Sequence, residues 1–546
     1  MKKRLYPLII IPCLLSGCAF LNRPAFDMTT LMNDTQYTSI KSKRFEEYDL
    51  SFDIASFRDY MKTLNSLVEE KTSLDREFVL AFNKVFNTTY NLRDKIQVAM
   101  TKYNAGGEEQ ENYKNIRYEL NDYFNEFLLW MPGFLTKIYH SSESIKNAIF
   151  GDMTDKEIEQ MIDSYRYDEN IANLKKQLSN YEDQAADLYN QLGMNRECAL
   201  EMMKIYVDYI KVGNELASYY DYDNYLSYVY KNTYNRDFDK EKYDLAFTYY
   251  KQYLLPVYGQ YQFRTEEYDK AAYSRLTTYN MFNKDLFLAG TFQRYASWMG
   301  GSYSLAYNHL FYDGLYCFTD EENAHGTAYI ASMTSAKDGL AFFTGKNQDI
   351  NTLIHEFGHY HANYANSDHN SNASFDILET HSQANEYIFC NYLENEYKDQ
   401  QYESTIQYYV DYKLKRSISY IANMSVVGEI EEYVFANYDK LTVDELVVAC
   451  ENIDQQYDGV STPYYWVYPI VNSSGYYVSY ATSMIASMEY YYRGKEDLEA
   501  CKNNYLAFVK YDGDKNSITN WEKGNIYSPF DERAYQYLAN NLLKSS

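Results

Sequence analysis

Two histidines and a glutamate lie close together in the run His355-Glu356-Phe357-Gly358-His359. On a helix, residues four apart share a face, so His355 and His359 can present two imidazoles to one metal ion. Glu356 then lies one residue round the helix, where its carboxylate can reach a water bound to the metal rather than the metal itself. The run therefore predicts a helix that binds one zinc ion (Zn2+) and carries a general base.

The next carboxylates along the chain provide a candidate third ligand. A catalytic zinc takes three protein ligands and keeps one position open. If residues 376–386 form a second helix, Glu379 and Glu386 lie on one face of it, two turns apart. Glu379 would complete a site of two histidines and one glutamate. Glu386 would either accept a hydrogen bond that orients an imidazole or be a solvated surface residue, and the sequence leaves both interpretations open.

The other histidines near these residues are weaker candidates. His361 and His381 each lie two residues from a predicted ligand, so we expect them to point away from the metal and to be structural or solvated. His325 precedes a predicted strand. His325 either reaches the cleft that would hold the metal or has no role there, and the second interpretation is favoured.

The elements that position these residues are expected to be mainly α-helical. Pro132 and Pro256 are the only prolines between residues 25 and 462, which leaves long stretches free to form helices. Two short β-prone runs, at residues 326–330 and 340–343, come shortly before the histidines and predict strands. The predicted fold is therefore mainly α, with a small β-sheet beside the zinc-binding helix.

The chain divides into four predicted segments. Residues 1–17 are expected to form an export signal, 18–45 an anchor and tether, 46–204 an N-terminal helical region, and 205–546 the region that carries the predicted zinc site. Within the third segment, residues 171–192 place apolar side chains at alternating spacings of three and four. This pattern predicts a helix that packs against another helix of the same chain.

The first residues are typical of an export signal. Basic residues at positions 2–4 are followed by an apolar run, Leu5 to Leu15, that is too short to span a bilayer. The next residues, Leu15-Ser16-Gly17-Cys18, resemble the lipobox of bacterial lipoproteins. That resemblance implies cleavage before Cys18, acylation of Cys18 and a membrane-anchored protein on the extracellular face. The alternative is an ordinary secretory signal peptide.

Composition excludes some partners. The chain has 77 acidic and 51 basic residues and a formal net charge of −26, which argues against binding of nucleic acid. Apart from Cys13 and Cys18, the cysteines are odd in number and have no paired spacing, so we expect buried free thiols rather than a disulfide framework. These are Cys198, Cys317, Cys390, Cys450 and Cys501.

The run HEFGH is followed, 24 residues after its first histidine, by E-x-x-S-Q-x-x-E. This arrangement resembles the thimet oligopeptidase and oligoendopeptidase F family of zinc peptidases, and is closer to the oligoendopeptidase F branch. Further likeness lies in Gly326-Thr327-Ala328-Tyr329 before the motif and in the tyrosine-rich segment 476–483 after it. The resemblance extends over roughly residues 205–490 and is most specific around the predicted zinc site.

The resemblance implies a fold of two helical lobes around a deep channel, which limits substrates to short oligopeptides. It also implies roles for individual residues. His355, His359 and Glu379 match the zinc ligands, and Glu356 matches the general base of a zinc-dependent endopeptidase.

Four further residues take roles from the same resemblance. Tyr480 and Tyr477 match tyrosines that hydrogen-bond the tetrahedral intermediate. Ala328 and Tyr329 match an edge strand that pairs with the backbone of the substrate. The oligomeric state is not predicted.

The sequence departs from the family at one position. The family usually has a histidine shortly before its tyrosines, and here Tyr468 or Ile470 stands in that neighbourhood. Two alternatives therefore stay open: a non-catalytic lipoprotein that binds peptides in the same cleft, and a zinc exopeptidase similar to dipeptidyl carboxypeptidases. A purely structural surface protein would leave the metal-ligand pattern unexplained.

Overall fold

The computed structural model describes most of the chain after the predicted tether. The predicted signal peptide and Cys18 lie outside the described residues, and within them no helix has the length and apolar character needed to cross a membrane. The described residues are 44–73, 75–151, 153–165, 169–261, 268–277, 290–319, 321–325, 328–333, 338–344, 350–366, 373–510 and 516–545.

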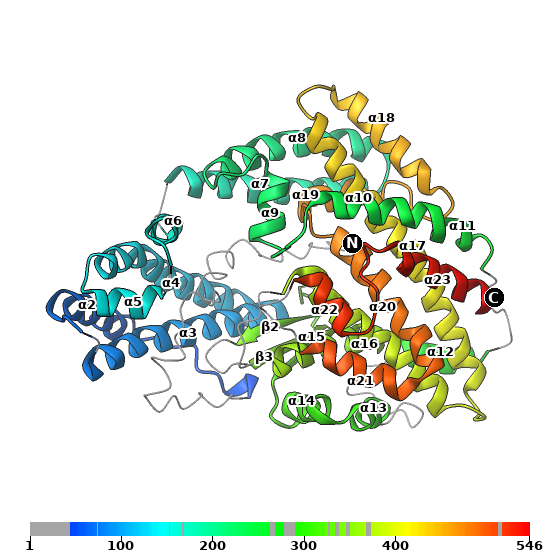
Figure 1. Cartoon of the computed structure of the whole chain (residues 1–546), viewed down its shortest axis with the longest axis horizontal. Coiled ribbons are helices and arrows are strands. Elements are labelled where there is room, and N and C mark those ends of the chain that lie inside the picture. Colours follow the sequence, from blue (N-terminus) through cyan, green and yellow to red (C-terminus); the bar gives the residue numbers. More distant parts are fainter. Residues whose placement is uncertain are drawn as a thin grey trace.

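The N-terminal lobe, residues 54–165, is a group of helices beside a larger C-terminal body (Figure 1). Its long helices α3 and α4 are joined at Gly106 and Gly107, whose φ angles of 80° and 84° are readily adopted only by glycine. The lobe has its own hydrophobic core, from Phe57 to Ile162. Its helices are α2 (Ile54–Glu70), α3 (Arg76–Ala105), α4 (Gln110–Tyr139), α5 (Glu143–Phe150) and α6 (Asp155–Tyr165).

The C-terminal body, residues 169–545, is built on a second core that runs from Leu174 to Leu542. Its first helices are α7 (Glu169–Leu192), α8 (Arg196–Ser218), α9 (Tyr225–Asn232), α10 (Lys240–Tyr249), α11 (Leu255–Tyr258), α12 (Lys270–Thr277), α13 (Thr291–Met299) and α14 (Gly301–Tyr312). After the strands come α15 (Ile350–Ala365), α16 (Phe375–Glu396), α17 (Glu403–Asn437), α18 (Val443–Asp454), α19 (Pro469–Asn472), α20 (Val478–Glu496), α21 (Leu498–Val509), α22 (Ser517–Lys523) and α23 (Glu532–Ser545).

Helix α7 packs on α8, as its apolar spacing predicts. Both helices contribute to the core of the C-terminal body. The two cores therefore divide between Ile162 and Leu174, whereas the predicted boundary between residues 204 and 205 falls inside α8. The reason is physical: an apolar stripe shows that a helix has a buried face, but not which core buries it.

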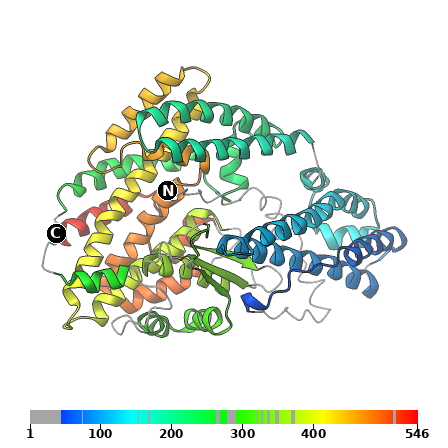
Figure 2. The same cartoon turned by 180° about the vertical axis from the view of Figure 1, so that it is seen from behind.

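A small sheet lies between the lobe and the body (Figures 1 and 2). Its strands are β1 (Tyr316–Thr319), β2 (Ala328–Met333) and β3 (Asp338–Thr344), in the order β1-β3-β2. Strand β1 is parallel to β3, and β2 is antiparallel to it, with Tyr329 opposite Phe342. Helix α3 contacts β1 and β2, so the sheet joins the N-terminal lobe to the body. The predicted mainly α fold with a small sheet is confirmed.

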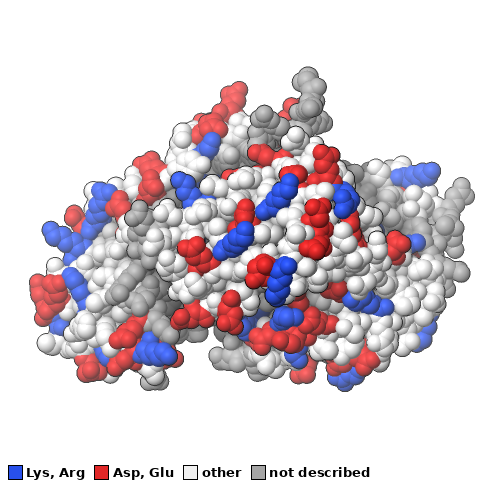
Figure 3. Space-filling model, turned by 90° about the horizontal axis from the view of Figure 1, so that it is seen from above, with Lys and Arg blue, Asp and Glu red and all other residues white. Residues whose placement is uncertain are grey.

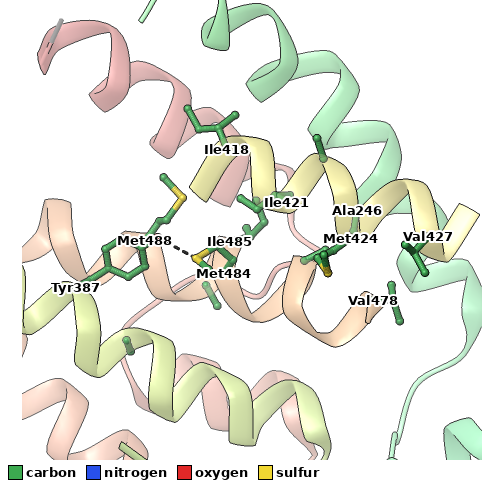
Figure 4. Packing of buried hydrophobic residues seen from close by; sticks show 14 of the residues in the cluster. Ala246, Tyr387, Ile418, Ile421, Met424, Val427, Val478, Met484, Ile485 and Met488 are labelled. Carbon is green, nitrogen blue, oxygen red and sulfur yellow. Dashed lines mark hydrogen bonds between the residues drawn. The ribbon is translucent and has the colours of Figure 1, made fainter. Parts of the chain in front are cut away.

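Helix α16 runs through the middle of the body and is buried along most of its length. Helix α20 packs against both α16 and α17, and the methionines Met424, Met484 and Met488 help to fill the space around them (Figure 4). The hydroxyl oxygen of Tyr387 on α16 lies 2.9 Å from Sδ of Met484 on α20. This packing fixes the helix that carries the predicted third ligand.

Charged side chains of both signs are interspersed over the face seen in Figure 3.

The cysteines are as predicted: the five in the described part of the chain are buried and free. The fold of this part therefore rests on packing and hydrogen bonds rather than on cross-links.

Candidate metal centre

Helix α15 brings two imidazoles to the carboxylate of Glu379 on α16. Its apolar residues Leu353, Ile354 and Phe357 are buried, which turns His355 and His359 together towards α16. Atom Oε2 of Glu379 lies 3.5 Å from Nε2 of His355 and 3.6 Å from Nε2 of His359.

One ligand atom from each of His355, His359 and Glu379 lies within 4.8 Å of the others. Two nitrogens and one carboxylate oxygen at this spacing suit a tetrahedral zinc that keeps one position open. The donor set therefore fits the ion that the sequence predicts.

A glycine allows the two helices to approach closely. A Cβ atom at Gly358 would lie 2.6 Å from Cα of Ser382 and 3.1 Å from the carbonyl oxygen of His381. Any side chain at position 358 would therefore push α15 and α16 apart and move Glu379 away from the histidines. Sequence reasoning missed this role, although a glycine inside a helix lowers helix stability and usually has a packing reason.

A buried amide also ties the two helices together. Asn385 donates from Nδ2 to the carbonyl oxygen of Ile354 at 2.7 Å. Its Oδ1 accepts hydrogen bonds from the hydroxyls of Tyr295, at 2.8 Å, and Tyr303, at 3.0 Å. Because each polar atom of this amide is satisfied, its burial does not destabilise the packing.

Glu386 contacts the back of the His355 ring. Its Oε1 lies 2.8 Å from Nδ1 of His355, and its Oε2 lies 2.5 Å from Nζ of Lys413 on α17. The side chain of Glu386 is only 9% exposed, which excludes the solvated interpretation. The contact is the one expected of a carboxylate that orients an imidazole.

The pKa values show how strongly this cluster favours positive charge. Burial opposes protonation of His355, but hydrogen bonds to Glu379 and Glu386 outweigh it and raise the pKa of the ring well above its usual value. Burial alone would raise the pKa of Glu379, yet the two histidines hold it far below its usual range. Burial likewise opposes ionisation of Glu386, and Lys413 and His355 lower its pKa. Two ionised, buried carboxylates beside two imidazoles provide a suitable environment for a cation.

Glu356 differs from the other two glutamates. Burial raises its pKa above the usual value, and the nearby His355 and His359 offset only part of that effect. A carboxylate whose pKa is raised is a stronger base than an ordinary glutamate, as a general base requires.

Two tyrosines reach the cluster from the start of α20. The hydroxyl of Tyr476 donates to Oε1 of Glu379 at 3.0 Å, and it lies 2.7 Å from the hydroxyl of Tyr480. Burial raises the pKa of both hydroxyls well above the usual value, so both stay protonated and able to donate hydrogen bonds.

The side chain of Tyr477 points in a different direction from those of Tyr476 and Tyr480. Its hydroxyl interacts with Asn472, and its ring centroid lies 6.3 Å from that of Tyr480. The structure thus places Tyr476, rather than Tyr477, beside Tyr480 at the carboxylate. Sequence reasoning missed Tyr476, although its spacing of four from Tyr480 would have indicated a shared helical face.

A turn before α20 positions Tyr476. Gly475 has a φ of 77°, and its N–H donates to Oε1 of the buried Glu431 at 2.8 Å. The hydroxyl of Tyr234 donates to the carbonyl oxygen of Ser474 at 3.1 Å. The left-handed backbone conformation and these two bonds set the direction in which the tyrosine leaves the turn.

A buried network around Asp376, at the start of α16, joins this helix to Arg236 between α9 and α10 and to α20. Nε of Arg236 lies 3.0 Å from Oδ2 of Asp376, and both side chains are fully buried. Asp376 also accepts hydrogen bonds from the hydroxyls of Tyr243, Ser479 and Thr482. This network connects the tyrosine-bearing helix to the helix that carries Glu379.

The other histidines lie where the sequence predicts. His361 is buried, with Nε2 3.0 Å from Oγ of Ser302, and His381 is buried against the ring of Phe508. Burial lowers the pKa of each to about 3, so both are neutral structural residues. Neither belongs to the metal-ligand cluster.

Strand β2 lies at an edge of the sheet, where Ala328 pairs with Phe343. The hydroxyl of Tyr329 donates to Oγ1 of Thr101 and accepts from Nδ2 of Asn104, each at 3.1 Å. The side chain of Tyr329 therefore holds the N-terminal lobe against the sheet, which leaves the backbone of the strand as the group that could pair with a peptide.

The two residues near the position of the family's histidine do not resemble it. Ile470 is fully buried. The ring of Tyr468 stacks on that of Tyr189, with centroids 4.9 Å apart, and its hydroxyl donates to Oδ1 of Asn472 at 2.8 Å.

Several solved structures have a similar fold. A putative oligoendopeptidase F from Bacillus anthracis str. Ames has a TM-score of 0.68 and 15% sequence identity, over 93% of this chain and 99% of that one. PZ peptidase A with inhibitor 2 has a TM-score of 0.67 and 14% identity, over 92% and 99%. Oligoendopeptidase-F from Enterococcus faecium has a TM-score of 0.52 and 13% identity, over 90% and 97%.

At these identities the likeness establishes the fold along nearly the whole chain. A scan against protein-family models and a search of curated proteins give no match. The deep channel that the resemblance implies stays a prediction.

Proposed function

We propose that the protein is a zinc-dependent endopeptidase that hydrolyses short oligopeptides. The observation that carries this proposal is the convergence of His355, His359 and Glu379, with Glu356 beside them, Tyr480 on the facing helix α20 and Tyr476 just before it. The shared fold with proteins described as oligoendopeptidases supports it.

His355, His359 and Glu379 would hold the ion. A bound zinc lowers the pKa of water towards neutrality and polarises the carbonyl group of the substrate. Glu356 accepts a proton from the attacking water and returns it to the leaving amine, a role suited to its raised pKa. The hydroxyl of Tyr480 donates a hydrogen bond that stabilises the negative charge on the former carbonyl oxygen, while the hydroxyl proton of Tyr476 stays in its hydrogen bond to Glu379.

The substrate would lie along the edge of the sheet. Backbone groups of Ala328 and Tyr329 on β2 would pair with the backbone of the peptide, which gives affinity without demanding a particular sequence. An extended peptide of a few residues is the form of substrate that such pairing recognises.

Hydrolysis of quenched fluorescent peptides by residues 19–546 tests this proposal. We expect cleavage that a chelator abolishes and added zinc restores. Peptides with an acetylated N-terminus and an amidated C-terminus separate the proposed endopeptidase from a dipeptidyl carboxypeptidase, because only the endopeptidase tolerates both blocks. If zinc binds but no peptide is cut, a non-catalytic peptide-binding protein becomes the better account.

We also propose that Cys18 is acylated and anchors the protein on the extracellular face of the membrane. The lipobox-like sequence before it supports this. Mass spectrometry of the N-terminal peptide from the protein expressed in bacteria would detect the acyl groups. A Cys18→Ala variant that stays in the membrane fraction would contradict the proposal.

A further inference from the structure

The two predicted histidine ligands differ in their surroundings. Nδ1 of His355 faces Oε1 of Glu386 at 2.8 Å. In the part of the chain that the structure describes, no comparable carboxylate pairs with Nδ1 of His359. His355 is therefore the ligand whose ring orientation depends on an outside carboxylate.

The second oxygen of that carboxylate is held by a lysine from a different helix. Nζ of Lys413 on α17 lies 2.5 Å from Oε2 of Glu386, and the side chains of the two residues are only 11% and 9% exposed. The ammonium group also lies 5.0 Å from the ring centroid of Tyr387, the residue that follows Glu386 on α16. Lysine is rarely buried to this degree unless it is paired, so its position indicates a specific contact.

Helix α17 is itself fixed at this point. The hydroxyl of Tyr387 donates to Oγ of Ser417 at 2.5 Å. The hydroxyl of Ser417 in turn donates to the carbonyl oxygen of Lys413 at 2.8 Å. The backbone from which Lys413 reaches Glu386 is therefore tied to α16 by a second route. Lys413 contacts Glu386 from a constrained position rather than from a flexible side chain at the surface.

Holding both oxygens of Glu386 has a consequence for His355. With Oε2 bound to Lys413, the carboxylate cannot rotate away, and Oε1 remains an acceptor for the proton on Nδ1. With the proton kept on Nδ1, Nε2 is the nitrogen that can present a lone pair to an ion beside Glu379, which is the tautomer that a metal ligand requires. Loss of the lysine would leave a buried carboxylate without its cation, free to rotate or to take up a proton.

We propose that Lys413 is a positioning residue for the metal centre: it holds Glu386 against Nδ1 of His355 and so fixes the orientation and tautomer of that ligand. The inference rests on the proposed zinc site. Lys413 contacts neither the metal nor the substrate, and its effect reaches the ion through two side chains in series.

Zinc affinity of the whole protein, measured by competition with a chromophoric chelator, tests this inference without reference to peptide cleavage. We expect Lys413→Met to weaken zinc binding about tenfold, in line with the effect of removing partners of metal ligands. Lys413→Arg keeps the charge and should restore most of the affinity. Lys415→Met is the matched control, because Lys415 lies on the same helix over the ring of Tyr258 and should leave the affinity unchanged.

A double variant distinguishes positioning from a general structural effect. If Lys413 acts through Glu386, Lys413→Met should weaken zinc binding no further in a chain that already carries Glu386→Gln. Wild-type affinity in Lys413→Met, or full additivity in the double variant, would overturn the inference. The visible spectrum of bound Co2+ should also change in Lys413→Met, because it reports the geometry of the ligands.

Two further outcomes are distinguishable. If Lys413→Met fails to fold by circular dichroism, Lys413→Gln takes its place, since glutamine is polar but one atom shorter than lysine and lacks the charge that holds Glu386. The same loss of zinc affinity is expected, and wild-type affinity would overturn the inference. Failure of the wild-type protein to bind zinc would instead contradict the proposed function.

Discussion

The N-terminal lobe and the centre of the C-terminal body are both helical, yet they bury different groups. The core of the lobe consists mainly of hydrophobic side chains, with a few buried polar groups such as Asp94, and ion pairs such as Arg58–Glu126 lie at its surface. The centre of the body buries the Arg236–Asp376 pair and the carboxylates of Glu379 and Glu386. Apolar packing is sufficient for a scaffold, whereas buried charge is costly and is maintained here around residues that must hold a fixed geometry.

The largest expected effect comes from changing the chemistry of the body without changing its packing. Glu356→Gln keeps the shape of the side chain but cannot accept a proton, so kcat/KM for a fluorescent peptide should fall about 10²–10⁴-fold. Zinc affinity should stay within about twofold, because Glu356 is not among the clustered ligand atoms. A variant that keeps full activity would remove Glu356 from the mechanism.

A core substitution in the lobe should lower stability without changing the chemistry of the body. Phe127 is fully buried, and Phe127→Ala should lower the free energy of unfolding of the lobe by about 3–5 kcal/mol. Zinc affinity of the folded protein should not change, because the two cores are separate. Denaturant unfolding followed together with zinc titration checks both parts. Weakened zinc binding in the folded variant would show that the two regions are coupled.

Replacement of glycine by alanine should change stability in opposite directions in the two regions. A Cβ atom at Gly358 in the body would meet the backbone of Ser382 at 2.6 Å, so Gly358→Ala should destabilise the protein by about 1–3 kcal/mol and weaken zinc binding. A Cβ atom at Gly133, in α4 of the lobe, meets nothing within 4 Å. Gly133→Ala should stabilise its helix by about 0.5–1 kcal/mol.

Thermal unfolding and zinc titration of both glycine variants provide the measurement. Equal effects at the two sites would contradict the claim that α15 and α16 approach each other through position 358.

The last prediction concerns pH. Salt bridges at the surface of the lobe hold the pKa values of carboxyls such as Asp75 and Glu126 below the usual range, whereas burial in the body raises the pKa of Glu431 to about 8. Because its pKa is higher in the folded than in the unfolded state, folding retains the proton of Glu431 between about pH 5 and pH 8. The stability that this proton provides is present below the unfolded-state pKa and is lost as pH rises through 8.

Glu431→Gln should remove that dependence. The wild-type free energy of unfolding should fall relative to the variant by up to about 1.4 kcal/mol per pH unit in this range. Urea unfolding of both proteins from pH 5 to pH 9 measures the difference, in which all other titrations cancel. Parallel curves for the two proteins would mean that Glu431 is ionised in the folded state.

Much of the metal centre could be predicted from the sequence because its determinants are local. The pairing of His355 with His359 follows from the helical repeat alone, and Glu379 follows once a second helix is assumed. The position of Tyr476 could not be predicted, because it depends on a left-handed turn at Gly475 and on contacts with Glu431. The importance of Gly358 depends on the distance between two helices, which no periodicity encodes.

The fold was predictable to a similar extent. Few prolines and clear apolar stripes indicated helices, and short β-prone runs indicated the sheet. The point at which the two cores divide could not be predicted, because the apolar stripe on α7 does not show that α8 buries it. Long-range contacts of this kind also determine the direction of the Tyr329 side chain, whose hydroxyl forms hydrogen bonds with α3.

Anomalous diffraction at the zinc absorption edge, from crystals of residues 19–546 grown with zinc, tests the central claim most directly. The account predicts one strong peak, about 2.0–2.2 Å from Nε2 of His355, from Nε2 of His359 and from the carboxylate of Glu379. A zinc peak at other residues, or none at this cluster with zinc in excess, would contradict the proposed metal centre.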